Sequence, residues 1–236
     1  MCHRYLLLEE HYRDILARIG LGPETDFRSR YNMAPGTGIP AVRRPAGGGV
    51  EAARLHWGLV PSWAKNGDSA GLMNARAESL ADKPSFRDAF RSRRCVIPAS
   101  GFYEWAKHGR TRRPWLFRWR DERPFGFAGL WEAWRAPDGS VRETCAIVTT
   151  APNDQIRPIH DRMPVMLKPE QFDAWLDPRA TAPESLAPLL HPAPAGAMSA
   201  VALDSRVNSV RHDDPACLAP AATETEGSGP QLSLGL

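Results

Sequence analysis

The chain has 236 residues, 42% of them hydrophobic, and a formal net charge of +3 at pH 7. This length accommodates one large domain or two small ones, and the apolar content supports a buried core. The amino terminus lacks the apolar run of a signal peptide and no stretch approaches a membrane span. These features exclude the secreted and membrane-embedded classes and lead us to expect a cytoplasmic protein.

Charge is spread unevenly along the chain. Residues 87–120 contain ten Lys and Arg against two acidic residues, whereas residues 212–236 contain four acidic residues and no Lys or Arg. A basic body with an acidic tail suits a polyanionic partner. Ordinary solvated arginines in an arginine-rich protein would explain the same pattern equally well.

The cysteines give no sign of a disulfide framework or a metal site. Cys2, Cys95, Cys145 and Cys217 form no CxxC pair, and no Cys/His cluster has zinc spacing. We therefore expect a reduced protein without a metal or another cofactor, in which Cys2 is a free thiol.

The first third of the chain is expected to hold one helix and short strands. Apolar residues recur at helical spacing over residues 9–20, before two glycines that stop the helix. A turn at 31–36 leads to a strand at 39–43, and another strand is expected at 53–60. A loop then runs to the segment 72–76.

Short strands dominate the rest of the chain. Ser85 has the chemistry of an N-cap for a helix at 86–92, and a second helix opens at Pro169 and ends before Pro178. Strands are expected at 94–98, 101–106, 114–119, 125–131, 143–149 and 198–203.

These elements predict the α+β class. We expect a single domain over residues 1–212, with a mainly antiparallel mixed sheet, a barrel-like core and short flanking helices. Residues 213–236 are small and polar and are expected to form a disordered acidic tail.

The amino terminus has a distinctive chemical prospect. If Met1 is removed, Cys2 carries an α-amine and a thiol, with reference pKa values of about 7.7–8.0 and about 8.5, so a useful fraction of each is nucleophilic near neutral pH. The amine can attack an aldehyde to give an imine, and the thiol can then close a thiazolidine ring. Most cysteines are instead small buried hydrophobes, so the Met-Cys pair alone is a weak signal.

Two further residues have acid–base potential. Glu104 stands among aromatic residues, where lost solvation would raise its pKa and suit it to donate a proton. The pattern alone favours a position on the wet face of a strand. His160, flanked by Asp161 and Arg162, has the chemistry of a general acid–base, although an exposed loop histidine would look the same.

Three polar residues have the chemistry of binding groups. Asn74 offers a donor and an acceptor together, although asparagine is common in loops. Arg76 and Arg162 are suited to phosphate contacts, and either could equally form a surface ion pair.

Taken together, the motifs of this chain resemble those of the SOS-response-associated peptidase (SRAP) family over residues 1–212. Each motif is weak alone, but their order and spacing are highly specific. They are Met1-Cys2 with Arg4, YNMAP at 31–35, WGLVPSW at 57–63, NARAE at 74–78, RCVIP at 94–98, GFYEW at 101–105 and IHDRMP at 159–164.

The resemblance implies a sensor of abasic sites in single-stranded DNA, working at the nucleoid. Cys2 would be the nucleophile that forms a thiazolidine with the ring-opened sugar aldehyde. Asn74 would orient the amine and the sugar, and Glu104 would promote ring opening and relay protons. His160 would assist imine formation and its reversal.

The resemblance also implies a set of DNA contacts. Arg4, Arg76 and Arg162 would hold phosphates, and Trp63 would stack on a base at the edge of the site. The tryptophan at position 57 is expected to belong to the core. The peptidase activity in the family name is expected to be self-processing of Met1, because the sequence shows no nucleophile–base pair with an oxyanion hole.

The chain departs from the family pattern at two positions. His3 stands where the family has glycine, and it would either crowd the DNA strand or add a second titrating group beside Cys2. Ala64 stands where some relatives carry a second tryptophan, so stacking would depend on Trp63 alone.

Two other function classes remain open from the sequence. A thiol peptidase would use Cys2 with His160 and Asn74, and a non-catalytic module would bind single strands through the basic band and the tryptophans. The tail Gln231–Leu236 resembles the start of the peptide by which bacterial repair proteins dock on the sliding clamp, but a meaningless apolar end explains it as well. Nothing requires more than a monomer.

Overall fold

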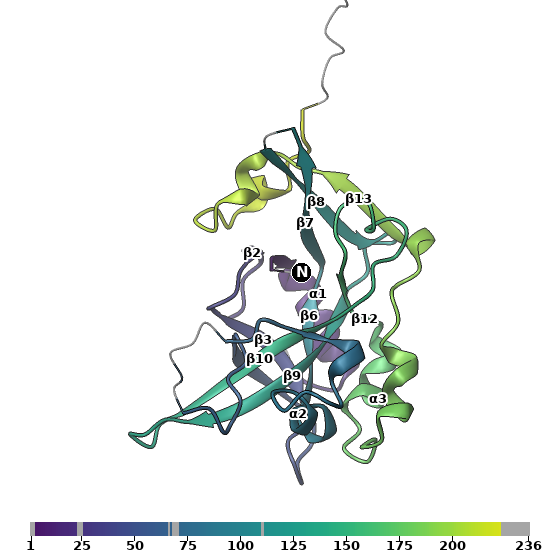
Figure 1. Ribbon diagram of the computed structural model, residues 1–236. Coiled ribbons are helices and arrows are strands. Elements are labelled where there is room, and N and C mark those ends of the chain that lie inside the picture. Colours follow the sequence, from purple (N-terminus) through teal and green to yellow (C-terminus); the bar gives the residue numbers. More distant parts are fainter. Residues whose placement is uncertain (1–2, 23–25, 66, 68–70, 110, 223–236) are drawn as a thin grey trace, which may run out of the picture.

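A closed barrel of five strands forms the centre of the molecule. The computed structural model describes residues 3–22, 26–65, 67, 71–109 and 111–222 (Figure 1). In order around the barrel, the strands are β4 (Glu51–Trp57), β3 (Gly38–Arg43), β6 (Arg94–Ala99), β9 (Phe125–Arg135) and β10 (Val141–Thr150). Each strand pairs with the next, and β10 pairs with β4 to close the ring. The pair β4–β10 is parallel and the other pairs are antiparallel. The predicted α+β class with a barrel-like core is confirmed.

Three short strands extend the barrel sheet, two paired with β10 and the last of them paired with β9. They are β5 (Asn74–Arg76), β11 (Met163–Pro164) and β12 (Met166–Leu167). Thr149 of β10 lies opposite Arg76 in the parallel pair with β5 and opposite Pro164 in the antiparallel pair with β11. This register brings the 74–78 and 159–164 motifs to one end of the barrel.

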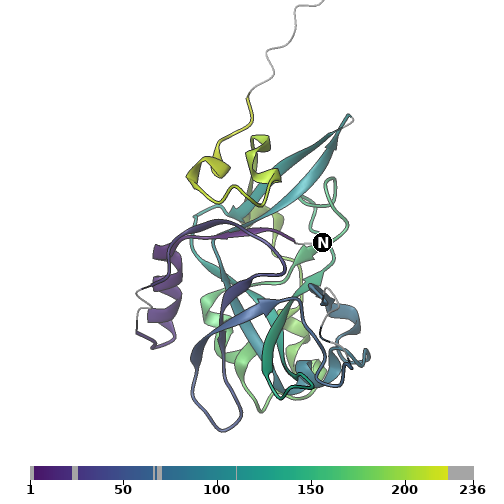
Figure 2. The same ribbon diagram turned by 90° about the vertical axis from the view of Figure 1, so that its left-hand side faces the viewer.

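A second antiparallel sheet lies against the barrel. Its strand order is β13 (Met198–Ala202), β8 (Thr111–Trp119), β7 (Gly101–His108), β1 (Tyr5–Leu7) and β2 (Arg30–Met33). Because β1 pairs directly with β7, the chain that leads out of the amino terminus runs beside the 101–105 motif. The β7–β8 hairpin projects away from the body of the molecule (Figures 1 and 2).

Short helices flank the two sheets. They are α1 (Glu9–Arg18), η1 (Ala77–Ser79), α2 (Arg87–Ser92), η2 (Pro169–Gln171), α3 (Phe172–Leu176), α4 (Pro183–Leu186), η3 (Ala187–Leu189), η4 (Ala195–Ala197), η5 (Ser205–Asn208) and η6 (Pro215–Leu218). The helix predicted at 9–20 is confirmed, and it buries Tyr12, Ile15 and Leu16. Ser85 does not cap α2, because the N-cap position falls on Phe86 and makes no side-chain hydrogen bond.

Aromatic side chains join the barrel to the second sheet. The Tyr5 ring of β1 meets Trp57 and Phe127 edge-on, with centroids 5.6 and 5.4 Å away. Trp57 is fully buried, as predicted. Such edge-to-face pairs each contribute about 0.5–1.5 kcal/mol beyond area burial, so they hold β1 in a defined position.

The segment after β13 folds back over β2. The Asn32 Nδ2 group donates to the carbonyls of Val207, Ser209 and His212, and Asp213 accepts from the backbone N–H groups of Tyr31 and Asn32. These contacts and η6 extend past residue 212, where the sequence suggested that the domain ends. Cys2 and the predicted clamp-binding peptide Gln231–Leu236 lie outside the described residues. Within the described part of the chain, no helix has the length and apolar character needed to span a bilayer.

Candidate functional site

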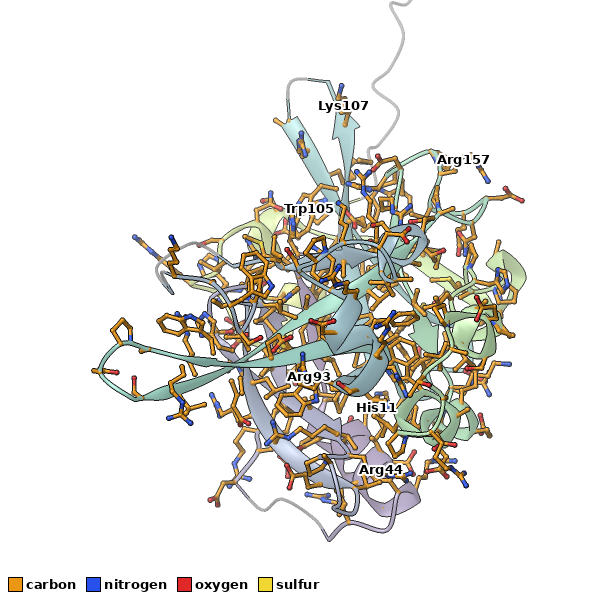
Figure 3. All side chains as sticks on the ribbon, turned by 60° about the horizontal axis from the view of Figure 1, so that its bottom comes forward. His11, Arg44, Arg93, Trp105, Lys107 and Arg157 are labelled. Atoms are coloured by element: carbon orange, nitrogen blue, oxygen red, sulfur yellow. The ribbon has the colours of Figure 1, made fainter. Side chains whose placement is uncertain are left out.

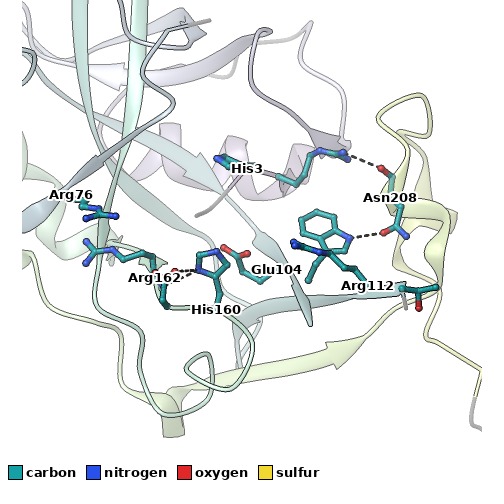
Figure 4. Close-up of a pocket in the computed structure, with 11 residues that line it drawn as sticks. His3, Arg76, Glu104, Arg112, His160, Arg162 and Asn208 are labelled. Atoms are coloured by element: carbon teal, nitrogen blue, oxygen red, sulfur yellow. Dashed lines mark hydrogen bonds and ion pairs between the residues drawn. The ribbon is translucent and has the colours of Figure 1, made fainter. Parts of the chain in front are cut away.

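A pocket of about 730 Å³ opens where the second sheet meets the end of β10 (Figure 4). Its walls come from the residues just before β1, from β5, β7 and β8, from the loop before β11 and from η5. Its lining residues are His3, Arg4, Arg76, Glu104, Trp105, Thr111, Arg112, His160, Asp161, Arg162 and Asn208. Of the residues predicted from the sequence, the pocket brings together Arg4, Arg76, Glu104, His160 and Arg162.

Glu104 is a buried carboxyl in the wall of this pocket. It stands in the middle of β7, opposite Trp115 of β8, and only 3% of the residue is exposed. The suggestion that Glu104 lies on the solvent-exposed face of its strand is therefore wrong. Burial raises the pKa of Glu104 to about 7. Near neutral pH both the protonated and the ionised form are therefore populated, so the group can both donate and accept a proton.

His160 lines the same pocket, from the loop that precedes β11. Its Nδ1 atom accepts a hydrogen bond of 3.0 Å from the backbone N–H of Arg162. Since a backbone N–H can only donate, the neutral ring carries its proton on Nε2. Burial lowers the pKa of His160, and the Asp161 carboxylate, 2.9 Å from Nδ1, opposes this effect by stabilising the charged ring. Each protonation state of the imidazole thus has a partner in place.

Two of the arginines are held firmly by protein groups. Arg162 donates to both carboxylate oxygens of Glu78 at 2.8 Å and to the Thr149 carbonyl at 2.6 Å. These hydrogen bonds lower the pKa of Glu78. Arg4 donates to Asn32 Oδ1 at 2.7 Å and to the carbonyls of η5. Both guanidinium groups therefore keep fixed positions at the pocket wall.

The other two arginines of the pocket are exposed and uncommitted. Neither Arg76 nor Arg112 makes a side-chain hydrogen bond or ion pair with any residue that the structure describes. Their charges are therefore available to an anion that enters the pocket.

Asn74 is not among the pocket residues but lies two residues before Arg76 on β5. Side chains two apart on a strand share a face, so Asn74 is on the Arg76 side of β5. Both polar atoms of its amide are buried and have no hydrogen-bond partner among the described residues. Leaving a buried polar group without a hydrogen bond costs about 1–3 kcal/mol of folding free energy. A ligand that hydrogen-bonds to the amide would remove this cost.

Trp63 stands apart from the pocket on the loop after β4. It is 62% exposed and does not line the pocket. The loop is held in place nearby, where Trp134 Nε1 donates to the Ala64 carbonyl at 2.7 Å. An exposed indole on a fixed loop is a suitable surface for stacking a base.

The sequence did not single out several lining residues. His3 drew attention only as a departure from the family pattern; burial lowers its pKa, and His160 and Arg4 act in the same direction. Arg112 was one of many arginines in the basic band, and Asn208 lies in no motif. Arg112 and Asn208 reach the pocket through the pairing of β7 with β8 and through the segment that folds back after β13. Local sequence patterns do not predict either arrangement.

A family model and several known proteins match this chain. A family model described as SOS response associated peptidase (SRAP) matches residues 1–210. The abasic site processing protein YoqW of Bacillus subtilis is 40% identical over 221 residues, which cover 91% of this chain and 97% of that protein. The abasic site processing protein HMCES of Gallus gallus is 29% identical over 229 residues, with 84% of this chain and 68% of that protein covered.

Solved structures show the same fold. A protein from Bacteroides thetaiotaomicron superposes with a TM-score of 0.80 at 26% identity, covering 94% of this chain and all of that one (100%). A protein from Bordetella bronchiseptica superposes with a TM-score of 0.73 at 26% identity, covering 86% of this chain and 100% of that one. The match over nearly the whole folded part shows that the chain belongs to the SOS response associated peptidase family.

Proposed function

We propose that this protein senses abasic sites in single-stranded DNA and cross-links to them through Cys2, shielding the lesion during the DNA damage response. The observation that carries the proposal is a buried acid, Glu104, with a pKa of about 7 in the same pocket as His160. His3, the next residue in the chain after Cys2, lines this pocket. Similar proteins named for abasic site processing support the same substrate.

The chemistry begins with release of Met1, which we propose to be self-processing. The free Cys2 amine then needs an aldehyde, and an abasic sugar is mostly a closed hemiacetal. Glu104 donates a proton to the ring oxygen as the C1 hydroxyl loses one, which opens the ring. The neutral amine attacks C1 to give a carbinolamine.

Loss of water then completes the linkage. Glu104, protonated again, donates to the departing hydroxyl, and the carbinolamine becomes an imine. The Cys2 sulfur attacks the imine carbon, its proton ends on the nitrogen, and the thiazolidine closes with one water released overall. His160, neutral near pH 7 with the proton on Nε2, accepts and returns protons during these steps and during reversal.

The remaining residues bind the DNA. Asn74, whose amide is buried without a partner among the described residues, orients the amine and the sugar. Arg4, Arg76 and Arg162 contact phosphates, which carry affinity without sequence preference, as a lesion in any sequence requires. Trp63 stacks on a neighbouring base.

The test is adduct formation by the purified protein. Intact mass measurement should show that Met1 is absent, and single-stranded DNA with an abasic site should give a product that survives denaturation. Undamaged DNA of the same sequence should give none. A protein that lacks Met1 and forms no adduct with abasic DNA would overturn the proposal.

A further inference from the structure

The β7–β8 hairpin carries positive charge outward from the pocket. Residues 105–113 contain four Lys and Arg and no acidic residue. Lys107 stands directly opposite Arg112 in the antiparallel register, and Trp105 stands opposite Pro114. Directly opposite residues share a face, as do residues two apart, so Trp105, Lys107 and Arg112 lie on one face of the hairpin.

This face is continuous with the pocket. Trp105 and Arg112 both line the pocket, and Lys107 is one step farther out, about 6.6 Å along the strand from Trp105. Figure 3 shows Trp105 near the body of the molecule and Lys107 toward the hairpin tip. A strand that leaves the pocket along the hairpin would pass an aromatic ring and then two cations.

The base of this face is rigid. Trp105 Nε1 donates to Asn208 Oδ1 at 2.6 Å, and the Arg4 guanidinium lies 5.7 Å from the centre of the indole. The ring is therefore fixed from two sides. A fixed aromatic beside a line of positive charge is the usual arrangement of a surface that follows single-stranded nucleic acid.

The side chains of Lys107 and Arg112 repel each other across the hairpin. Like charges directly opposite each other destabilise an antiparallel pair. Lys107 and Arg112 are both exposed, and neither makes a side-chain hydrogen bond or ion pair within the described part of the chain. An anion that lies across the pair would offset this repulsion.

We infer that the Trp105–Lys107–Arg112 face binds the phosphodiester backbone of the DNA strand that flanks the lesion. The inference rests on the proposed function, because it takes the pocket as the place of the abasic nucleotide. Two phosphate contacts there set part of the affinity before any covalent step.

The experiment measures reversible binding of undamaged single-stranded DNA at several salt concentrations. The variant Lys107→Gln/Arg112→Gln should lower the slope of log K against log salt by about 1.4, or about 0.7 for each lost phosphate contact. Its affinity should fall on the order of tenfold at 0.1 M salt. The melting temperature should stay equal or rise, because the cross-strand repulsion is removed.

Two controls separate this effect from net charge and from misfolding. Arg13→Gln/Arg18→Gln removes the same charge from α1, which lies away from the β7–β8 hairpin (Figure 2), and should keep the wild-type slope. Lys107→Arg/Arg112→Lys keeps both charges and should also keep it. An unchanged slope in the glutamine variant, or an equal fall in the α1 control, would overturn the inference.

Failure of this inference and failure of cross-linking give different results. A wild-type protein that forms the abasic-site adduct, while the hairpin variant binds undamaged DNA with the wild-type slope, rejects the hairpin surface alone. A wild-type protein that forms no adduct rejects the proposed function whatever the hairpin variant does.

Discussion

Arg162 donates two hydrogen bonds of 2.8 Å to the carboxylate of Glu78, although the two residues are 84 positions apart in the sequence. The pair ties the 74–78 motif to the 159–164 motif at the end of β10. It also fixes the backbone next to His160, because the N–H of Arg162 is the group that donates to the imidazole. We expect this pair to position the site more than to stabilise the fold.

Glu78→Gln tests that expectation. The Glu78 side chain is 55% exposed, so the change should cost less than about 1 kcal/mol of stability. The loosened Arg162 should nevertheless slow adduct formation about threefold to tenfold. Single-turnover rates measure the effect, with Glu184→Gln on the exposed start of α4 as the control. Equal rates in the two variants would show that the pair has no role in positioning.

The second prediction concerns the pH dependence of cross-linking. Glu104 must be protonated to open the sugar, so its contribution falls as the pH rises through about 7. The Cys2 amine must be neutral, and its contribution rises toward its reference pKa of about 7.7–8.0. The rate should therefore peak between these values.

Glu104→Gln should slow the reaction about a hundredfold or more and remove the decline on the alkaline side of the peak. Rates from pH 5.5 to 9 test this, and Glu10→Gln on α1 is the matched control. A variant with the wild-type profile would show that Glu104 is not the acid.

The same carboxyl predicts an effect on stability. Burial raises the folded-state pKa from an ordinary value of 4.5 to about 7, so the folded protein keeps a proton that the unfolded chain has lost between these pH values. Stability must fall as the pH rises through this window, by on the order of 3 kcal/mol in total. Glu104→Gln has no such penalty.

This variant should therefore be more stable than the wild type at pH 8, and the difference should vanish near pH 4. Urea unfolding at both pH values measures it. If the glutamine variant were no more stable than the wild type at pH 8, the folded protein would not disfavour the ionised form of Glu104.

Arg94 gives a prediction for the fold itself. This buried residue donates to the carbonyls of Phe90 and Arg91 at the end of α2 and to those of Trp175 and Asp177 at the end of α3. Replacement by methionine leaves these carbonyls without their donor, and we expect a loss of about 3 kcal/mol in the free energy of unfolding. Arg91→Met, which changes an exposed side chain of the same helix, should cost less than about 1 kcal/mol. Similar losses in both variants would contradict this role.

Much of the fold could be predicted from local pattern. The strands between residues 94 and 150 have β-branched and aromatic runs bounded by turns, and their predicted limits differ from the observed ones by a few residues at most. The barrel closure could not be read in the same way. It depends on the parallel pair β4–β10, which joins residues far apart in the chain, and β5 is too short to have a period of its own.

The motifs predicted most of the residues that meet in the pocket, but the pKa shifts there could be derived only from the structure. An alternating strand normally shows one face to water, so the pattern suggested a wet Glu104. The structure buries Glu104 instead, and this burial raises its pKa. Likewise, the exposed cations opposite each other at Lys107 and Arg112 become visible only once the hairpin register is known.

The most direct test of the proposed cross-link is the mass of the product formed with abasic single-stranded DNA. The thiazolidine mechanism predicts a product mass equal to that of the protein without Met1 plus the DNA minus one water, with the link mapped to Cys2 and stable without a reducing agent. Cys2→Ala should give at most an adduct that needs borohydride for capture. A stable, unreduced adduct of the Cys2→Ala variant, or a link mapped to another residue, would contradict the thiazolidine mechanism.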